Sequence, residues 1–362
     1  MRFYLFLFIV ALADFALAKA LDRGLIKPMV RPVHGEYRRG ELELTSSYRE
    51  KLKFPCAPVE NVSRGSATLS GGCRETDARG LSRFRPNSEC VYSFPNGTEG
   101  TGATIRFDGR GRRFVPSSGG EANHVLVLGC SVAFGLGLPD EQSLAAYLGR
   151  ELQSTRAFLA AAPASGPNDI YAHLPEYLSD MALTPGTAVY VGIGSHIERF
   201  VGTFSHIGTY AENKAALREN SPGHFSVLGP WKTAYPWRTQ IAKILMQSGF
   251  IRYTALDFPF VLNQDLQRYV RLIGAIKNQY TGKFPDGRFV YVFAVGSARH
   301  YNNQLKSHLD RAKIEYLDYS ELCPSALLGP EPASIPGEGH PSAALFREWA
   351  KIIAQDLSGS RQ

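Results

Sequence analysis

The sequence lacks the closely spaced ligands that common metal and redox sites require. It contains five cysteines in 362 residues, and no two of them form a C-x-x-C pair. A zinc ribbon or a thioredoxin-type site is therefore unsupported. The histidines show no H-x-H or H-x-x-x-H spacing, and the glycines near residue 130 form neither G-x-G-x-x-G nor a G-K-[ST] ending. The sequence thus implies no metal and no nucleotide cofactor.

A basic run and a second long apolar run are also missing. The formal net charge of +7 fits an anionic partner such as an acidic glycan or a membrane surface, although many basic proteins have no such partner. Nucleic-acid binding is not supported, because no basic run alternates with aromatic residues. Beyond the first twenty residues, no stretch approaches the length needed to cross a bilayer.

Residues 1–20 have the layout of a secretory signal peptide. Arg2 gives a short positive start, Phe3–Leu17 is almost wholly apolar, and small residues at 16–18 or 18–20 offer a cleavage site. An apolar run of about 15 residues is short for a stable span, and the alternative is an uncleaved N-terminal anchor. We expect a periplasmic or secreted protein without a membrane span after cleavage. Nothing in the pattern indicates an oligomeric state.

Export makes disulfides possible. Cys56, Cys73 and Cys90 lie in the N-terminal region, where either Cys56–Cys73 or Cys73–Cys90 is the expected pair. The third cysteine then pairs with Cys323 or stays free. Cys130 follows an apolar run, so we expect it to be a buried thiol.

The chain changes texture near residue 120. Residues 21–120 are rich in Gly, Ser, Arg and Pro, with short alternating pieces at Cys90–Phe94 and Thr104–Phe107. These features predict a loop-rich segment with a few short β-strands, held by a disulfide. Residues 121–358 instead alternate apolar runs with helical patterns. We expect them to form one domain with an insertion at 196–285, which could act as a lid or a substrate wall.

The alternating pattern predicts an α/β fold with three α/β/α layers and a five-stranded parallel sheet. The expected strands are Val125–Leu128, Ala157–Ala162, Thr187–Ile193, Arg288–Val295 and Ile314–Tyr319. The first expected helix follows Asp140, which is its expected cap. A last helix is expected after Ser342 as its cap, with Leu345, Trp349, Ile352 and Ile353 facing inward. The helices expected between them are Pro167–Met181, Trp237–Gln247, Asn263–Gln279 and Asn302–Ala312. His173 and His308 fall in such helices, where surface positions are favoured. Trp231, Tyr235 and Trp237 could stack on a sugar ring, although packing of the insertion onto the sheet is favoured.

Two local patterns place reactive side chains at strand or helix ends. Gly129-Cys130-Ser131 ends the first strand, and Gly337-Glu338-Gly339-His340-Pro341 precedes the last helix. A serine hydroxyl needs a base to take its proton and an acid to orient that base. His340 is the candidate base and Glu338 the candidate acid for Ser131. Both loops would meet at the carboxyl edge of a parallel sheet.

These blocks resemble those of the SGNH/GDSL hydrolase superfamily, in particular its exported bacterial members. Leu128–Glu141 is similar to the first block, with Ser131, a glycine four residues later and an acidic pair that opens a helix. Phe107–Arg113 is similar to the lead-in of bacterial secreted members, and Glu338–Ser342 to the closing block. The resemblance covers roughly residues 105–357. It implies the flavodoxin-like form of the predicted sheet and a covalent acyl-enzyme on Ser131.

The chain departs from the family pattern at three positions. The resemblance implies an oxyanion hole made by the amides of Ser131 and Gly166, with Ala164 as the alternative to Gly166. The family's third block supplies an asparagine, but here the strand runs into Ser195-His196, so His196 or Ser195 must donate instead. Losing one such donor costs about 10²–10³ in rate. Glu338 replaces the usual aspartate, and Cys130 replaces the aspartate before the serine.

The sequence as a whole predicts an exported serine esterase, that is, an O-acyl hydrolase or O-acyltransferase. The resemblance implies a small-molecule or polysaccharide ester as substrate, such as an acetyl ester of a cell-envelope carbohydrate. Arg199 and Ser195 are candidates for substrate binding, Arg199 through an anionic substrate group. The alternative is a catalytically decayed SGNH-fold protein that binds carbohydrate or assists envelope assembly. The missing asparagine and the altered acid motivate that alternative.

Overall fold

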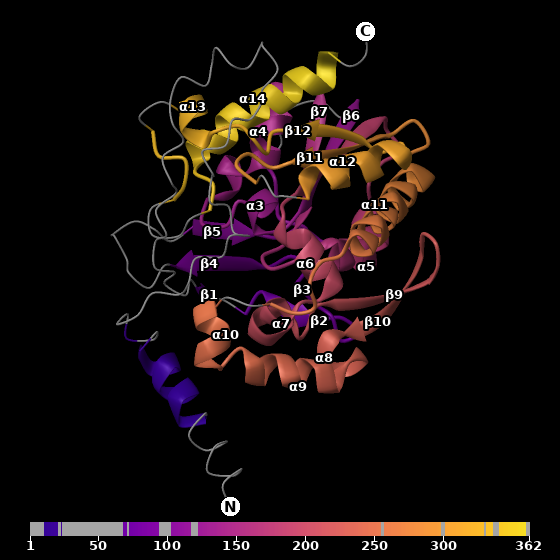
Figure 1. Cartoon of the computed structure of the whole chain (residues 1–362). Coiled ribbons are helices and arrows are strands. Elements are labelled where there is room, and N and C mark those ends of the chain that lie inside the picture. Colours follow the sequence, from indigo (N-terminus) through magenta and orange to yellow (C-terminus); the bar gives the residue numbers. More distant parts are fainter. Residues whose placement is uncertain are drawn as a thin grey trace, which may run out of the picture.

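The centre of the protein is a five-stranded parallel sheet (Figure 1). The computed structural model describes residues 11–20, 23, 68–70, 72–93, 103–116, 122–254, 257–297, 301–328, 331–335 and 340–359. The sheet has the order β12-β11-β8-β6-β7. Its strands are β6 (Asn123–Gly129), β7 (Thr155–Ala161), β8 (Gly186–Gly192), β11 (Arg288–Phe293) and β12 (Glu315–Asp318). Counted along the chain this is the order 2-1-3-4-5, which confirms the predicted flavodoxin-like fold.

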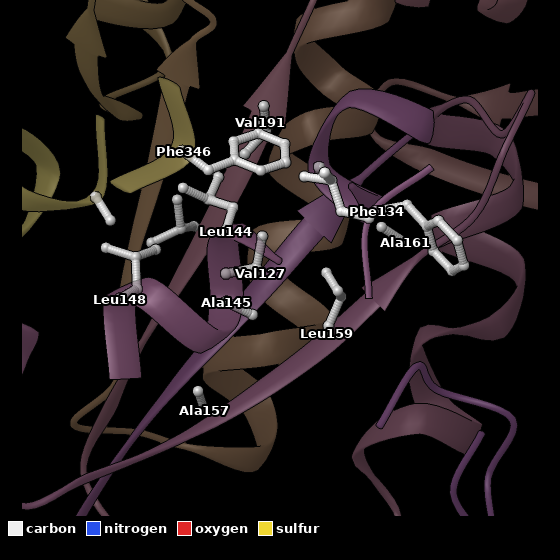
Figure 2. Close-up of a cluster of buried hydrophobic side chains, with 14 of the residues drawn as sticks. Val127, Phe134, Leu144, Ala145, Leu148, Ala157, Leu159, Ala161, Val191 and Phe346 are labelled. Carbon is white, nitrogen blue, oxygen red and sulfur yellow. The ribbon is translucent and has the colours of Figure 1, made fainter. Parts of the chain in front are cut away.

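Helices cover both faces of the sheet, as the three-layer prediction requires. Alternate residues of β6 point to opposite layers: Val125 and Val127 belong to one buried cluster, Leu126 and Leu128 to the other. The first cluster includes α3 (Ser131–Phe134), α4 (Leu144–Glu151) and α14 (Ala343–Gly359), and Figure 2 shows part of it. The second includes α5 (Pro167–Leu178), α6 (Ser195–Val201), α11 (Asn263–Lys283) and α12 (Asn302–Arg311).

The cap of α4 differs from the prediction. Asp140 does not cap this helix but begins a short 3-10 turn, Asp140–Gln142, and its carboxylate is bonded to the exposed Arg106 and the buried Arg113 instead. Ser143 is the N-cap residue, and its hydroxyl accepts a hydrogen bond from the amide of Ala146 at 3.2 Å. The prediction for the last helix is confirmed, because the Ser342 hydroxyl accepts from the amide of Leu345 at 3.2 Å. Three residues of its predicted stripe are buried and Ile352 is half-buried.

The stretch between β8 and β11 contains most of the additional elements. They are α7 (Phe204–His206), a π-helical turn Ile207–Ala211, β9 (Ala215–Ser221), β10 (His224–Pro230), α8 (Trp231–Ala234), α9 (Pro236–Leu245) and α10 (Gly249–Thr254). The strands β9 and β10 form an antiparallel hairpin. Helix α11 closes the stretch and packs against α5 as part of the helical layer on the sheet. The short helix α13 (Pro324–Leu328) precedes α14.

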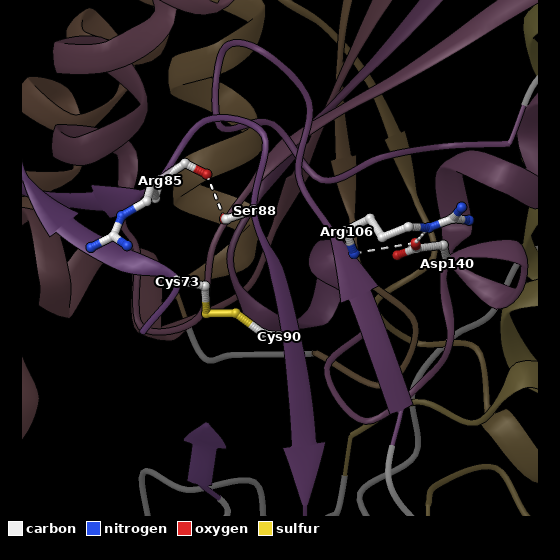
Figure 3. Close-up of a disulfide and its surroundings, with 6 residues drawn as sticks. All are labelled: Cys73, Arg85, Ser88, Cys90, Arg106 and Asp140. Carbon is white, nitrogen blue, oxygen red and sulfur yellow. Dashed lines mark hydrogen bonds and ion pairs between the residues drawn. A yellow bond between two sulfur atoms is a disulfide. The ribbon is translucent and has the colours of Figure 1, made fainter. Parts of the chain in front are cut away.

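The N-terminal region contributes small antiparallel sheets. Strands β1 (Thr68–Ser70), β4 (Glu89–Ser93) and β5 (Ala103–Arg106) form one, and β2 (Arg74–Thr76) and β3 (Ser82–Phe84) form another. A disulfide joins Cys73 to Cys90, which is one of the two predicted pairs (Figure 3). Cys323 is also disulfide-bonded, and Cys130 is a buried free thiol as predicted. Cys56 lies outside the described residues.

None of the helices in the described ranges is both long enough and apolar enough to cross a membrane. Residues 11–20 are helical. Cleavage of the predicted signal peptide stays a prediction.

Candidate active site

Ser131 lies at the carboxyl edge of the sheet, directly after the strand β6. Cys130 is the N-cap residue of α3, and Ser131 is the first residue of that helix. Gly135, in the left-handed conformation, ends the helix after one turn. The Ser131 side chain is mostly buried, with 8% of its surface exposed. In open parallel sheets this edge is where ligands bind, so the serine lies where a reactive group would be expected.

Gly129 allows the close packing behind Ser131. A Cβ atom at this position would lie 2.6 Å from the Cβ of Ala133 and 3.1 Å from the carbonyl oxygen of Val191. Any side chain would therefore push α3 away from the neighbouring strand β8. The close packing of α3 against β8 beside Ser131 thus requires a glycine at the first position of the Gly129-Cys130-Ser131 pattern.

Arg113 holds the loop that follows α3. Its side chain is fully buried and its Nε donates to Oδ1 of Asp140 at 3.0 Å. Asp140 also accepts from Nε of Arg106 at 3.0 Å (Figure 3). The remaining guanidinium N–H groups donate to three loop carbonyls, those of Phe134, Gly135 at 2.9 Å and Leu138 at 2.5 Å. Arg113 comes from the lead-in block before β6, so that block fixes the loop next to Ser131.

Gly166 lies at the same edge, between β7 and α5, where it is the N-cap residue of α5. Its amide donates to Oδ2 of Asp169 at 2.9 Å. The Cβ of Arg199 lies 2.9 Å from the place that a Cβ of Gly166 would occupy, so Arg199 packs directly on this glycine. Ala164, the alternative candidate, has a left-handed backbone with φ of 60°. The structure therefore brings Gly166 and Arg199 together, two of the residues singled out from the sequence.

Ser195 and His196 begin helix α6 at the carboxyl end of β8. Ser195 is half-buried, whereas His196 is completely buried. The His196 Nδ1 lies 3.0 Å from the hydroxyl of Tyr190. Burial raises the pKa of Tyr190 well above its ordinary value and lowers that of His196 well below its own, so both groups are neutral.

This contact allows two tautomers of His196. Either the neutral Tyr190 hydroxyl donates to Nδ1, which leaves the imidazole proton on Nε2, or Nδ1–H donates to that hydroxyl. The Nε2 atom has no hydrogen-bond partner among the residues that the structure describes. In the first tautomer, His196 has a buried N–H donor at the position where the family pattern described above has an asparagine.

Two cations meet next to Gly166. Nη1 of Arg199 donates to the carbonyl of Ser165 at 2.6 Å, and Nζ of Lys214 donates to the Ser165 hydroxyl at 3.1 Å. Both side chains are buried, and burial lowers the pKa of Lys214 to about 8. The sequence analysis did not find Lys214, because it follows a turn in the insertion with no motif around it. A buried pair of cations at this edge favours a negatively polarised group nearby.

His340 precedes the helix α14, and its backbone is held in a short antiparallel pairing. Its carbonyl accepts from the amide of Ile335 at 2.8 Å, and Ser334 and Pro341 form a β-bridge. Helix α14 in turn reaches the loop after Ser131: Cε2 of Phe346 lies 3.2 Å from the Cβ position of Gly135. The segment that carries His340 therefore leads into a helix that contacts the Ser131 loop. Glu338 lies outside the described residues.

Buried histidines make the fold sensitive to acid. His124 is 3% exposed and bonded to the hydroxyl of Tyr280 at 2.8 Å, and burial lowers its pKa from 6.5 to about 4. A depressed pKa contributes stability that is present above pH 6.5 and is lost as the pH falls through 6.5 towards 4. We expect His124 alone to cost about 2 kcal/mol of unfolding free energy between about pH 7.5 and about pH 5.

Urea denaturation at both pH values, for wild type and His124→Gln, measures this contribution. The variant should show a smaller loss of stability on acidification. Equal losses in the two proteins would contradict the assignment to His124.

Comparison with known proteins gives structural matches only. No family model matches the chain, and no curated protein matches its sequence. A GDSL-family lipolytic protein from Veillonella parvula shares 11% identity, with 65% of this chain and 98% of that chain covered and a TM-score of 0.36. An acetyl xylan esterase from Butyrivibrio proteoclasticus shares 8% identity, with 75% and 68% covered and a TM-score of 0.38.

A third match covers a larger share of this chain than the other two do. It is a carbohydrate esterase family 2 enzyme with a carbohydrate-binding domain from Corynascus thermopiles, with 11% identity, 83% of this chain and 92% of that chain covered, and a TM-score of 0.38. The solved structures that match thus include proteins of the GDSL family, which the sequence blocks resemble. The strand order of the sheet is observed in this chain directly and does not depend on these matches.

Proposed function

We propose that the protein is a serine esterase or O-acyltransferase of the SGNH type that works through a covalent acyl-enzyme on Ser131. The observation that carries the proposal is the position of Ser131, at the carboxyl end of a sheet with 2-1-3-4-5 order. The contact between Phe346 and Gly135 supports His340 as its partner, because it places the start of α14 against the Ser131 loop. The resemblance of the two sequence blocks supports Ser131 as the nucleophile and His340 as the base.

In the proposed reaction, His340 removes the proton from the Ser131 hydroxyl while the oxygen attacks the ester carbonyl carbon. The tetrahedral intermediate collapses as the bond to the alcohol oxygen breaks, and His340 gives its proton to that leaving oxygen. Water or a sugar hydroxyl, deprotonated by His340, then attacks the acyl group on Ser131. The acyl group leaves as an acid or as a new ester, and the serine regains its proton. Glu338 would orient the imidazole throughout.

The oxyanion would be held by N–H groups from three segments. The Ser131 amide is the first donor, and His196 through Nε2–H is the proposed third, with the half-buried Ser195 hydroxyl as the alternative. The Gly166 amide is already bonded to Asp169, so its contribution requires a hydrogen bond shared between the carboxylate and the oxyanion. Donors fixed in this way need no reorganisation as the charge develops, which is the main source of such stabilisation.

The proposed substrate is an acetyl or short acyl ester of a cell-envelope carbohydrate in the periplasm or outside the cell. The position of Arg199 supports a substrate with an anionic or polar group next to its ester. Arg199 packs on Gly166, and its guanidinium is bonded to the carbonyl of Ser165. A hydrolase and a transferase share all of these residues and differ only in the acceptor of the acyl group.

The test uses purified protein, a short-chain aryl ester and a serine-reactive fluorophosphonate probe. We expect wild type to turn over the ester and to bind the probe covalently, and Ser131→Ala to do neither while its circular dichroism spectrum is unchanged. Absence of both turnover and labelling in wild type would support the alternative of a decayed site. Labelling that persists in Ser131→Ala would place the nucleophile elsewhere.

A further inference from the structure

Helix α9 has its apolar side turned away from the protein. Trp237, Ile241 and Ile244 have exposed fractions of 82%, 47% and 68%. Their spacing of four and three residues places them on one face of the helix. The residues that α9 buries against the protein are Thr239 and Ala242. A helix on the surface of a water-soluble domain normally buries its large apolar side chains, so this orientation is inverted.

The exposed face continues onto neighbouring segments. Phe250 on α10 is 55% exposed, and Leu12 and Phe15 in the helical segment 11–20 are 51% and 61% exposed. In Figure 1 segment 11–20, α10 and α9 lie at the same end of the molecule. We define the apolar face as the four side chains of α9 and α10, Trp237, Ile241, Ile244 and Phe250. Leu12 and Phe15 belong to the predicted signal peptide and extend this face only in a chain that keeps it.

Specific contacts seat segment 11–20 against α10. Oδ1 of Asp14 accepts from the hydroxyl of Ser248 at 2.9 Å and from the amide of Phe250 at 2.7 Å. A Cβ on Gly249 would lie 2.3 Å from the carbonyl oxygen of Asp14 and 2.4 Å from the amide nitrogen of Ala18. Only glycine permits this approach. Segment 11–20 is therefore seated on the start of α10, the helix that follows α9.

Cations predominate in the stretch that carries the apolar face. The 24 residues 231–254, which span α8 to α10, contain four cations and no Asp or Glu: Lys232, Arg238, Lys243 and Arg252. Lys243 pairs with Glu212 outside this stretch. An apolar stripe with a tryptophan, flanked by cations, is the composition of a helix that lies in the interface of an anionic bilayer.

We propose that the apolar face docks on an anionic membrane surface, with Trp237, Ile241 and Ile244 inserted at the level of the lipid headgroups. One observation favours a bilayer over a second copy of the chain. The cations of 231–254 would repel the same stretch of another copy, whereas they attract an anionic lipid surface. Docking does not depend on the proposed catalytic activity.

The test uses the protein exported by a bacterial host from the full-length gene, with its N-terminus determined by mass spectrometry. The purified protein is mixed with phosphatidylglycerol vesicles or with phosphatidylcholine vesicles and sedimented. Trp231 and Trp349 are buried, so a blue shift of tryptophan emission on binding reports on Trp237. We expect binding to the anionic vesicles, a blue shift, and weakening by salt.

The double variant Trp237→Ser/Ile244→Ser should bind the anionic vesicles at least about tenfold more weakly. Leu183→Ser is the matched control, because Leu183 is 78% exposed but lies between α5 and β8, outside the apolar face. It should bind as wild type does, and thermal melts should show that both variants are folded. Absence of vesicle binding by wild type, or equal effects of the two variants, would overturn the proposal. So would a wild-type dimer that the double variant converts to a monomer without vesicle binding, which would assign the face to a second copy.

Discussion

His340→Ala is expected to lower kcat/KM towards an activated aryl ester by about 10⁴- to 10⁶-fold. Without the imidazole, nothing removes the proton of the Ser131 hydroxyl at neutral pH, and nothing protonates the leaving alcohol. The residual rate would come from oxyanion donors and substrate binding alone. Steady-state kinetics on the purified variant measures the loss.

The matched control is His224→Ala. His224 is exposed on β10, outside the proposed site, and its replacement should leave the rate within about twofold of wild type. The double variant Ser131→Ala/His340→Ala should be no slower than either single variant, because residues that act as a unit are not additive. Additive losses would show that the two residues act independently. A loss below tenfold for His340→Ala would mean that another base serves Ser131.

Asp140→Ala is expected to lower the free energy of unfolding by about 3–5 kcal/mol. The change would leave the fully buried guanidinium of Arg113 without its carboxylate, and it would also remove the partner of Arg106. An uncompensated buried charge is costly because neither water nor another anion can reach it. Urea denaturation measures the loss, and the esterase rate should fall as well, since Arg113 holds the loop after Ser131.

Glu331→Ala is the matched control for this prediction. Glu331 and Arg347 form an ion pair at 3.4 Å with side chains that are 54% and 46% exposed. Removing an exposed pair should cost no more than about 1 kcal/mol. If Asp140→Ala and Glu331→Ala cost the same, the buried pair does not stabilise the fold in the way described.

The sheet could be predicted from the sequence because its central strands are buried on both faces. All seven residues of β8 are buried, and such strands read as continuous apolar runs. Helix caps were less predictable, because neighbouring residues offer similar side chains. Asp140 and Ser143 can both cap a helix. Ser143 is the cap in this structure, because the carboxylate of Asp140 is bonded to Arg113 and Arg106.

The prediction that His173 and His308 lie on the surface was wrong. They are 3% and 9% exposed. Nε2 of His173 lies 3.5 Å from a carboxylate oxygen of Asp77, and Nε2 of His308 lies 2.9 Å from Oδ1 of Asn263. These partners are distant in the sequence. Helical periodicity shows which side of a helix is apolar, but it contains no information on which polar group from another segment will cover a histidine.

In the candidate site, too, the features that depend on a short stretch of sequence were predicted, and the contacts between separate elements were not. The Gly129-Cys130-Ser131 pattern was placed correctly at the sheet edge because strand ends can be read locally. The bond from Tyr190 to His196 and the packing of Arg199 on Gly166 were not predicted. Both join residues on different elements, or on the two sides of a turn, whose approach is set by the packing of helices on the sheet. The roles of these residues stay predictions that the kinetic variants test.

The anchoring of Arg113 has a consequence for how this protein could have been assembled in evolution. Its amide also donates to the carbonyl of Leu159 on β7, so the lead-in block is joined to the sheet through main chain and side chain alike. A gene fragment that started at residue 121 would encode the five parallel strands but no partner for Asp140. Recombination at that junction would leave the loop after Ser131 without its side-chain support, even though every proposed catalytic residue would be intact. The lead-in block and residues 121–358 are therefore expected to be inherited together as one unit.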